Sequence, residues 1–163
     1  MRLFKHLFAR SASALFPTPT LDRIADAITA SERLHRGEIC FAVESALHWR
    51  EVLADVDSRT HAESAFGALR VWDTEANNGV LIYLLLADHR LEIVADRGLD
   101  DLVSAEQWRG VAQMMEERLR AGEAEAAVLA GIDEIGRILA VHFPQHDDRP
   151  DADELPNRPV ILG

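Results

Sequence analysis

The chain has 163 residues, of which 48% are hydrophobic and 28% charged, and it carries a formal net charge of −11 with a pI near 5.0. This size and composition indicate one soluble domain with short extensions. The acidic balance argues against nucleic-acid binding, which needs a basic face, and fits a cytoplasmic protein that attracts cations.

The first segment, residues 1–16, combines Arg2, Lys5 and Arg10 with leucine and phenylalanine residues, and we predict a basic amphipathic helix. Arg10 interrupts the apolar run, which argues against a secretory signal, and no apolar run in the chain is long enough to span a bilayer. Two interpretations stay open: the helix packs on its own domain, or it contacts a membrane surface or a partner.

A second helix is predicted from Thr18, as N-cap before a first-turn proline, to Gly37. The stretch "EICFAVES", residues 38–45, alternates in the way a strand does. It contains Cys40, the only cysteine, which we interpret as a buried structural thiol. Residues 46–58 fit either a short helix or a loop.

The middle of the chain predicts a helix over residues 59–72 and then two strands. Residues 79–87, "GVLIYLLLA", are nearly all apolar, which is typical of a central strand covered on both faces. A tight corner at residues 88–89 leads into residues 90–96, which alternate and are predicted to pair with the first strand as a hairpin.

Two helices and a tail complete the chain. Ser104 and Gln107 form a capping-box pattern for a helix that ends at Ala121, and a last helix is predicted over residues 123–141. The tail, residues 144–163, is rich in proline and aspartate, and its apolar "RPVIL" is expected to dock on a surface. The order of these elements predicts the α/β class: a three-layer α/β/α sandwich around a small mixed β-sheet.

The predicted organisation has three parts. Residues 1–16 are the N-terminal helix, residues 18–143 the α/β domain and residues 144–163 the tail. No catalytic signature such as a G-x-S-x-G elbow, a P-loop or a zinc-binding HExxH is present. His142, His146, Asp147 and Asp148 lie close together in sequence, but the proline at position 144 makes helical metal-ligand spacing a poor interpretation.

Polar residues gather at one end of the predicted hairpin. The start of its first strand lies near the end of its second, so the amide and carboxylate side chains there are expected to converge. Such oxygen ligands suit Ca²⁺ or Mg²⁺, although the same residue types also build ordinary turns. The predicted metal ligands are Asn77, Asn78, Asp96, Asp100 and Asp101.

The stretch "NNGVLIYLLLADHRLEIVADRGLDD" resembles the core of the TPM domain family. Upstream, "ASERLHRGEICFAVE" resembles the family's first helix and strand. Downstream, "GEAEAAVLAGIDEIGRILAVHFP" resembles its last helix, and "DELPNRPVIL" the ending of soluble bacterial members. The resemblance covers residues 21–162. Besides the metal candidates, the positions that match the family motif are Gly79, Asp88, Arg90 and Gly98.

The resemblance implies an α/β/α sandwich and two kinds of function. Some bacterial relatives bind divalent cations, and plant thylakoid relatives are described as acid phosphatases. We therefore expect a module that binds a divalent cation or a partner near the inner face of the membrane; the partner would be a LemA-type or membrane-anchored TPM protein. The alternative is a metal-assisted acid phosphatase. In that case Asn78, Asp96 and Asp100 would hold the cation. Arg97 is the only positively charged side chain nearby that could bind the phosphate.

Overall fold

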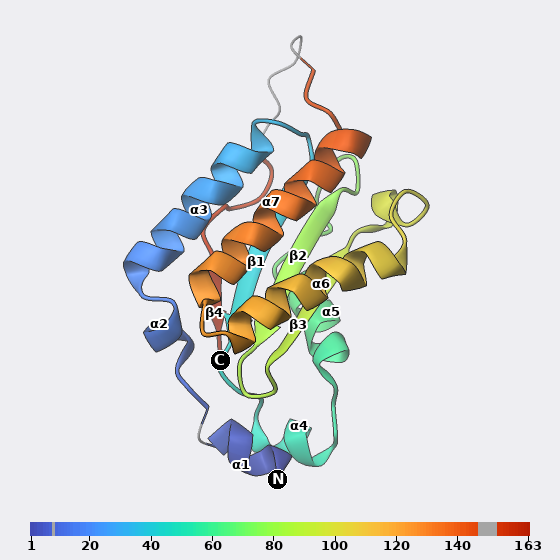
Figure 1. Cartoon of the computed structure of the whole chain (residues 1–163). Coiled ribbons are helices and arrows are strands. Elements are labelled where there is room, and N and C mark those ends of the chain that lie inside the picture. The colour runs from blue at the N-terminus through green and yellow to red at the C-terminus, as the bar shows by residue number, and fades with distance from the viewer. Residues whose placement is uncertain (8, 147–152) are drawn as a thin grey trace.

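A four-stranded mixed sheet with the strand order β3-β2-β1-β4 forms the centre of the molecule. The computed structural model describes residues 1–7, 9–146 and 153–163 (Figure 1). The strands are β1 (Glu38–Glu44), β2 (Gly79–Leu85), β3 (Arg90–Ala95) and β4 (Val160–Leu162). The helices are α1 (Arg2–Leu7), α2 (Ala12–Leu15), α3 (Thr18–Glu32), α4 (Trp49–Leu53), α5 (Ser58–Ala68), α6 (Ala105–Arg120) and α7 (Ala124–His142), with a 3-10 turn η1 (Arg97–Leu99).

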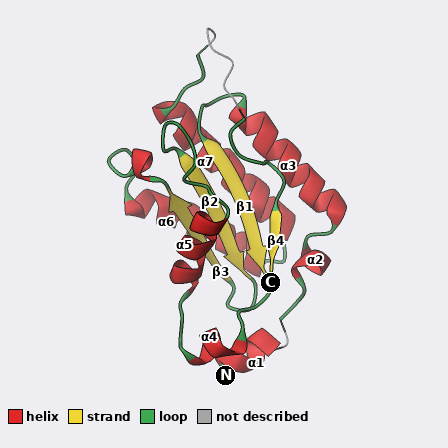
Figure 2. Ribbon diagram, turned by 180° about the vertical axis from the view of Figure 1, so that it is seen from behind, coloured by secondary structure: helices red, strands yellow, loops and turns green. Residues whose placement is uncertain are grey.

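Helices cover both faces of this sheet. α3, α6 and α7 lie on one face, and α5 lies on the other (Figures 1 and 2). Alternate residues of β1 face the two sides: Ile39 and Phe41 enter the larger core beneath α3 and α7, whereas Ala42 enters the smaller core beneath α5. The predicted three-layer α/β/α sandwich is confirmed.

The hairpin of β2 and β3 has the predicted form. β2 is buried at all seven positions, as expected of a strand covered on both faces. β3 runs antiparallel to it, with Val80 opposite Ala95 and Leu85 opposite Arg90. The corner residue His89 has a φ of 51°, a left-handed conformation that a tight reversal requires. The start of β2 and the end of β3 therefore lie at the same end of the sheet.

The N-terminal prediction of one helix over residues 1–16 is wrong. Two short helices, α1 and α2, replace it, because tertiary contacts hold each part separately. The backbone N–H of Ala12 donates to Ser45 Oγ, and Phe16 packs edge-on against Phe41 in the core. Among the described residues, no helix has both the length and the apolar character needed to cross a bilayer.

Helix boundaries differ from the predictions at two places and agree at others. Pro17, not Thr18, occupies the N-cap position of α3, and the helix ends at Glu32, five residues before Gly37. Residues 46–58, which the sequence left open, contain α4. α6 has the predicted capping box, in which Ser104 accepts from the N–H of Gln107.

The C-terminal tail docks, as its apolar end predicted, and the surface it docks on, which the sequence left open, is its own domain. β4 pairs in parallel with β1, with Ala42 opposite Val160 and Glu44 opposite Leu162, and Leu155 is buried in the smaller core. Part of the predicted tail, residues 147–152, lies outside the described residues. β4 fills one edge of the sheet next to β1, so β3 forms the opposite edge.

Candidate functional site

The backbone at the ends of β2 and β3 converges as the sequence predicted. The N–H of Asp96 donates to the carbonyl of Gly79 at 2.9 Å, and the N–H of Gly98 donates to the carbonyl of Asn77 at 2.9 Å. Gly98 is required here, because a Cβ at this position would lie 2.5 Å from the carbonyl oxygens of Ala76 and Asn77. The strand ends are therefore held together by tight backbone contacts.

The predicted side-chain ligands at this end do not share one centre. The amide of Asn78 donates to the carbonyl of Arg36 at 2.9 Å, and the carboxylate of Asp96 accepts from the N–H of Arg97 at 2.8 Å. Asn78 Oδ1 and Asp96 Oδ2 are buried without a partner among the described residues, whereas Asp100 and Asp101 are exposed. The three aspartates do not form a group of converging carboxylates. Ion binding at Asn77, Asn78, Asp96, Asp100 and Asp101 stays a prediction.

The motif residues Asp88 and Arg90 lie at the opposite end of the hairpin. Asp88 accepts from Arg2 Nη2 at 2.9 Å and lies 3.0 Å from His6 Nε2, while the N–H of Leu47 donates to His6 Nδ1 at 2.9 Å. These contacts fix α1 to the hairpin corner, which is a structural role for Asp88. His146 is exposed, and Asp147 and Asp148 lie outside the described residues.

A different acidic cluster is present at the amino end of β1. Within the described part of the chain, Glu32, Glu38 and Asp153 form the one group of three potential His, Cys or acidic ligands whose atoms all lie within 4.8 Å of one another. They come from the end of α3, the start of β1 and the tail, so the fold alone brings them together. Such a set of carboxylate oxygens is suited to a hard cation.

Backbone contacts hold the cluster in place but leave it without a positive partner. Glu38 is 3% exposed; its Oε1 accepts from the N–H of Glu154 at 3.1 Å, and its Oε2 has no partner among the described residues. Glu32 accepts from the N–H of Ile39 at 3.0 Å. No lysine, arginine or histidine in the described chain forms an ion pair with Glu32, Glu38 or Asp153. Buried carboxylates in this situation are costly when ionised.

Burial changes the protonation of these groups. It raises the pKa of Glu32 to about 8 and that of Glu38 to about 7, and the neighbouring acids add to the rise. The pKa of Cys40, the next residue on the same face of β1, is raised to about 12 by burial and by the same carboxylates. Cys40 is half-buried and protonated, in agreement with a structural thiol instead of a reactive one.

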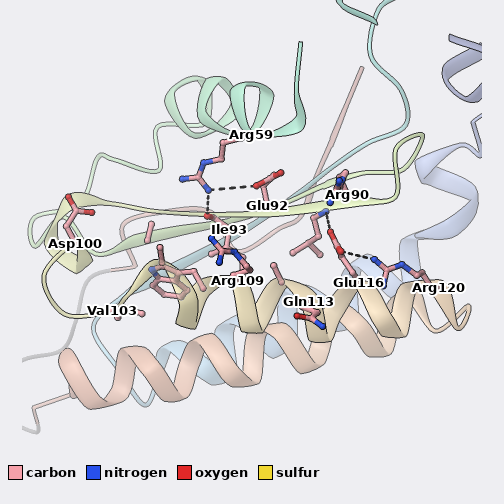
Figure 3. Close-up of a pocket in the computed structure, with 15 residues that line it drawn as sticks. Arg59, Arg90, Glu92, Ile93, Asp100, Val103, Arg109, Gln113, Glu116 and Arg120 are labelled. Carbon is pink, nitrogen blue, oxygen red and sulfur yellow. Dashed lines mark hydrogen bonds and ion pairs between the residues drawn. The ribbon is translucent and has the colours of Figure 1, made fainter. Parts of the chain in front are cut away.

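A groove along the outer edge of β3 collects basic side chains, of which the sequence analysis had singled out Arg90 alone. It has a volume of about 830 Å³ and lies between β3 and α6, with Arg59 of α5 on its other side (Figure 3). Arg59 and Arg90 come from one side of the groove and Arg109 and Arg120 from α6. These residues are up to 61 positions apart in the sequence (120 − 59), and only the packing of α6 beside β3 brings them together.

Comparison with known proteins gives one family and a set of solved structures. A sequence model described as the TPM domain matches residues 11–138. The NMR structure of the BA42 protein from the psychrophilic bacterium Bizionia argentinensis is similar, with a TM-score of 0.76, 28% identity and coverage of 96% of this chain and 98% of that one. A comparison with curated proteins gives no match.

A second solved structure supports the fold alone. It is the N-terminal domain of a protein from P. gingivalis, with a TM-score of 0.63 and 16% identity over 83% of this chain and 85% of that one.

Proposed function

The chain belongs to the TPM domain family, and from this premise we propose that it is a divalent-cation-binding module whose ion is held by Glu32, Glu38 and Asp153. The observation that carries the proposal is the buried Oε2 of Glu38, which has no partner among the described residues and lies within a cluster of carboxylates. Buried polar oxygens are rarely left unpaired in folded proteins, and a bound cation would satisfy this one.

The ligand chemistry favours Ca²⁺ over softer metals. All three side chains offer carboxylate oxygens, and neither histidine nor thiolate belongs to the group. Asp153 is exposed, so water would complete the six to eight oxygens that Ca²⁺ takes. Mg²⁺ binds similar oxygens but demands a stricter octahedral arrangement, and we expect it to bind more weakly.

Ca²⁺ is expected to bind more tightly at about pH 8.5 than at about pH 6. The raised pKa values of Glu32 and Glu38 mean that both groups hold protons at the lower pH, and the ion must displace them. Affinity should rise by up to about tenfold per pH unit for each proton released. Calorimetric titration of the metal-free protein with CaCl₂, together with two-dimensional amide NMR, measures the affinity and locates the site.

The same linkage has a defined sign for the ion-free fold. The contribution of Glu32 and Glu38 to the stability of the fold is fully present below the unfolded pKa of 4.5. It is lost as the pH rises through the folded pKa values of about 7 and 8. Ca²⁺ should therefore raise the melting temperature most at alkaline pH. Saturable shifts at Asn77–Gly79 and Asp96–Asp101 without shifts at Glu32 and Glu38 would place the ion at the hairpin end instead, and flat titrations would overturn the proposal.

We further propose that α1 and α4 contact a membrane surface. Half of the large hydrophobic residues that are exposed in the described chain lie on or beside these two helices, which pack together at one end of the molecule (Figure 1). They are Met1, Phe4, Leu7, Trp49 and Leu53. On α1 the side chain of His6 is buried while those of Phe4 and Leu7 are exposed, so the helix has an outward apolar side.

Basic side chains on and near α1 and α4 favour a lipid membrane as the surface that these helices contact. Lys5 on α1, Arg50 on α4 and Arg10 shortly after α1 are all exposed, and the guanidinium of Arg50 lies 5.3 Å from the ring centre of Trp49. Anionic headgroups attract such residues, while aromatic rings prefer the interface. A LemA-type or membrane-anchored TPM protein is the alternative occupant.

In a vesicle assay we expect the Phe4→Ser, Trp49→Ser double variant to bind at least about tenfold more weakly than wild type, since both side chains lose interfacial contact. Sedimentation with vesicles of phosphatidylcholine and phosphatidylglycerol, in a ratio of roughly three to one, measures this. Trp72→Ser is the matched control, because Trp72 and Trp49 are both 48% exposed. Equal losses in both variants, or no vesicle binding by wild type, would contradict lipid contact.

A metal-assisted phosphatase is less well supported. That activity needs the cation and the basic groups for phosphate at one site. The acidic cluster lies beside β1, whereas Arg90 and Arg109 line the groove at β3, and β2 runs between the two strands. The arrangement therefore favours ion binding without phosphoryl transfer.

A further inference from the structure

The outer edge of β3 presents backbone groups that no strand uses. In an antiparallel pair, the backbone groups of alternate residues point toward the paired strand and away from it. Because the N–H of Asp96 donates to the carbonyl of Gly79, Asp96 points toward β2 and the residue before it points away. The N–H and carbonyl groups of Leu91, Ile93 and Ala95 therefore point away from β2. Among the described residues, β3 has no neighbouring strand on this side.

Side chains satisfy only part of this edge. Arg59 Nη1 donates to the carbonyl of Ile93 at 2.7 Å, and the N–H of Leu91 donates to Glu116 Oε1 at 3.1 Å (Figure 3). The N–H groups of Ile93 and Ala95 have no hydrogen bond within the described chain. Arg59 and Glu116 are long, flexible side chains that a strand could displace, and the groove of about 830 Å³ provides room beside them.

The charge of the groove differs from that of the whole chain. Four arginines and three acidic residues line it, although the chain carries a net charge of −11. Arg59 and Arg120 are engaged in ion pairs with Glu63 and Glu116, whereas Arg90 and Arg109 form none among the described residues. The free guanidinium groups lie on the two sides of the edge, one on β3 and one on α6.

We propose that this edge binds an extended acidic segment of a protein partner, which adds to the sheet as a fifth strand beside β3. The N–H groups of Ile93 and Ala95 donate to the backbone of the segment, and Arg90 and Arg109 receive its carboxylates. Six residues of β3 match a segment of about 20 Å. The proposal does not depend on cation binding, because the acidic cluster lies on β1.

The test uses the full chain and a fluorescein-labelled hexapeptide of alternating valine and glutamate. We expect saturable binding by fluorescence anisotropy, at least tenfold weaker in the Arg90→Glu, Arg109→Glu variant. Arg118→Glu is the matched control, since Arg118 is exposed on the same helix but does not line the groove. Amide exchange at Ile93 and Ala95 should slow when the peptide binds.

Two further probes separate strand addition from charge attraction alone. The same peptide N-methylated throughout keeps its charge but cannot pair as a strand, and it should not bind. The lysine counterpart should not bind either. Absence of saturable binding up to millimolar peptide, or equal binding of the N-methylated peptide, overturns the proposal. These wild-type experiments hold even where the double variant fails to fold, which circular dichroism would show.

Discussion

In the Glu38→Gln variant, Ca²⁺ affinity is expected to fall by at least about 100-fold, because one of three charged ligands becomes neutral. Glu38 is the most buried member of the cluster, and its Oε2 is the oxygen without a partner. Glutamine has the same shape, so it can keep the hydrogen bond from the Glu154 N–H. Isothermal titration with CaCl₂ at about pH 8.5 measures the loss under conditions in which the wild-type cluster is ionised.

The same variant should be more stable than wild type when no ion is present. Burial raises the pKa of Glu38 to about 7, so wild type buries an ionised carboxylate above that pH and glutamine does not. Weaker binding together with a higher melting temperature separates loss of a ligand from loss of the fold.

Asp96→Asn provides the matched control for the choice of site. We expect it to bind Ca²⁺ as wild type does, because Asp96 does not belong to the cluster and its Oδ1 accepts from the N–H of Arg97. A large loss of affinity in Asp96→Asn, with Glu38→Gln unaffected, would assign the ion to the hairpin end.

Gly79→Ala should lower the free energy of unfolding by about 3 kcal/mol. A Cβ at position 79 would lie 2.1 Å from the carbonyl oxygen of Val71 and 3.0 Å from its Cγ1. Val71 is fully buried and its N–H bonds to the carbonyl of Phe66, so this backbone cannot move without disturbing the end of α5. Gly79 also pairs with Glu38 in the sheet, so the change should weaken Ca²⁺ binding as well.

Urea unfolding followed by circular dichroism measures this effect, and Gly110→Ala is its control. A Cβ at position 110 meets nothing within 4 Å, and Gly110 lies inside α6, so alanine there should stabilise the protein by up to about 1 kcal/mol. If Gly79→Ala unfolds at the wild-type urea concentration, the close approach of Val71 to β2 is not a constraint on the fold.

The features that could be predicted from the sequence are those set by neighbouring residues. The apolar run of β2, the alternation of β3 and the corner between them specify the hairpin locally. The capping box at Ser104 likewise depends on four consecutive residues. These local patterns, together with simple strand geometry, were enough to predict that Asn77 and Gly98 lie close together.

The acidic cluster could not be predicted because its members belong to three separate segments. Glu32 and Glu38 are six residues apart, but α3 ends at Glu32 and the chain turns before β1, so helical spacing does not apply. Asp153 comes from a segment that sequence patterns described only as a tail. The signal that was present is the "GE" at the start of β1, where a glutamate directly precedes the apolar run of residues 39–43. A charged residue at such a position needs a partner or a ligand.

The parallel pairing of β4 with β1 affects the order in which the molecule assembles. Ala42 lies opposite Val160, a separation of 118 residues (160 − 42), whereas the β2–β3 hairpin closes over a few residues. Contacts between such distant parts of a chain form late in folding, because a long loop must close first. The hairpin can therefore form early, while Asp153 reaches Glu38 only when the tail joins the sheet. An intermediate without β4 would have a nearly complete core but an unfinished acidic cluster, so ion binding would report the last step of folding.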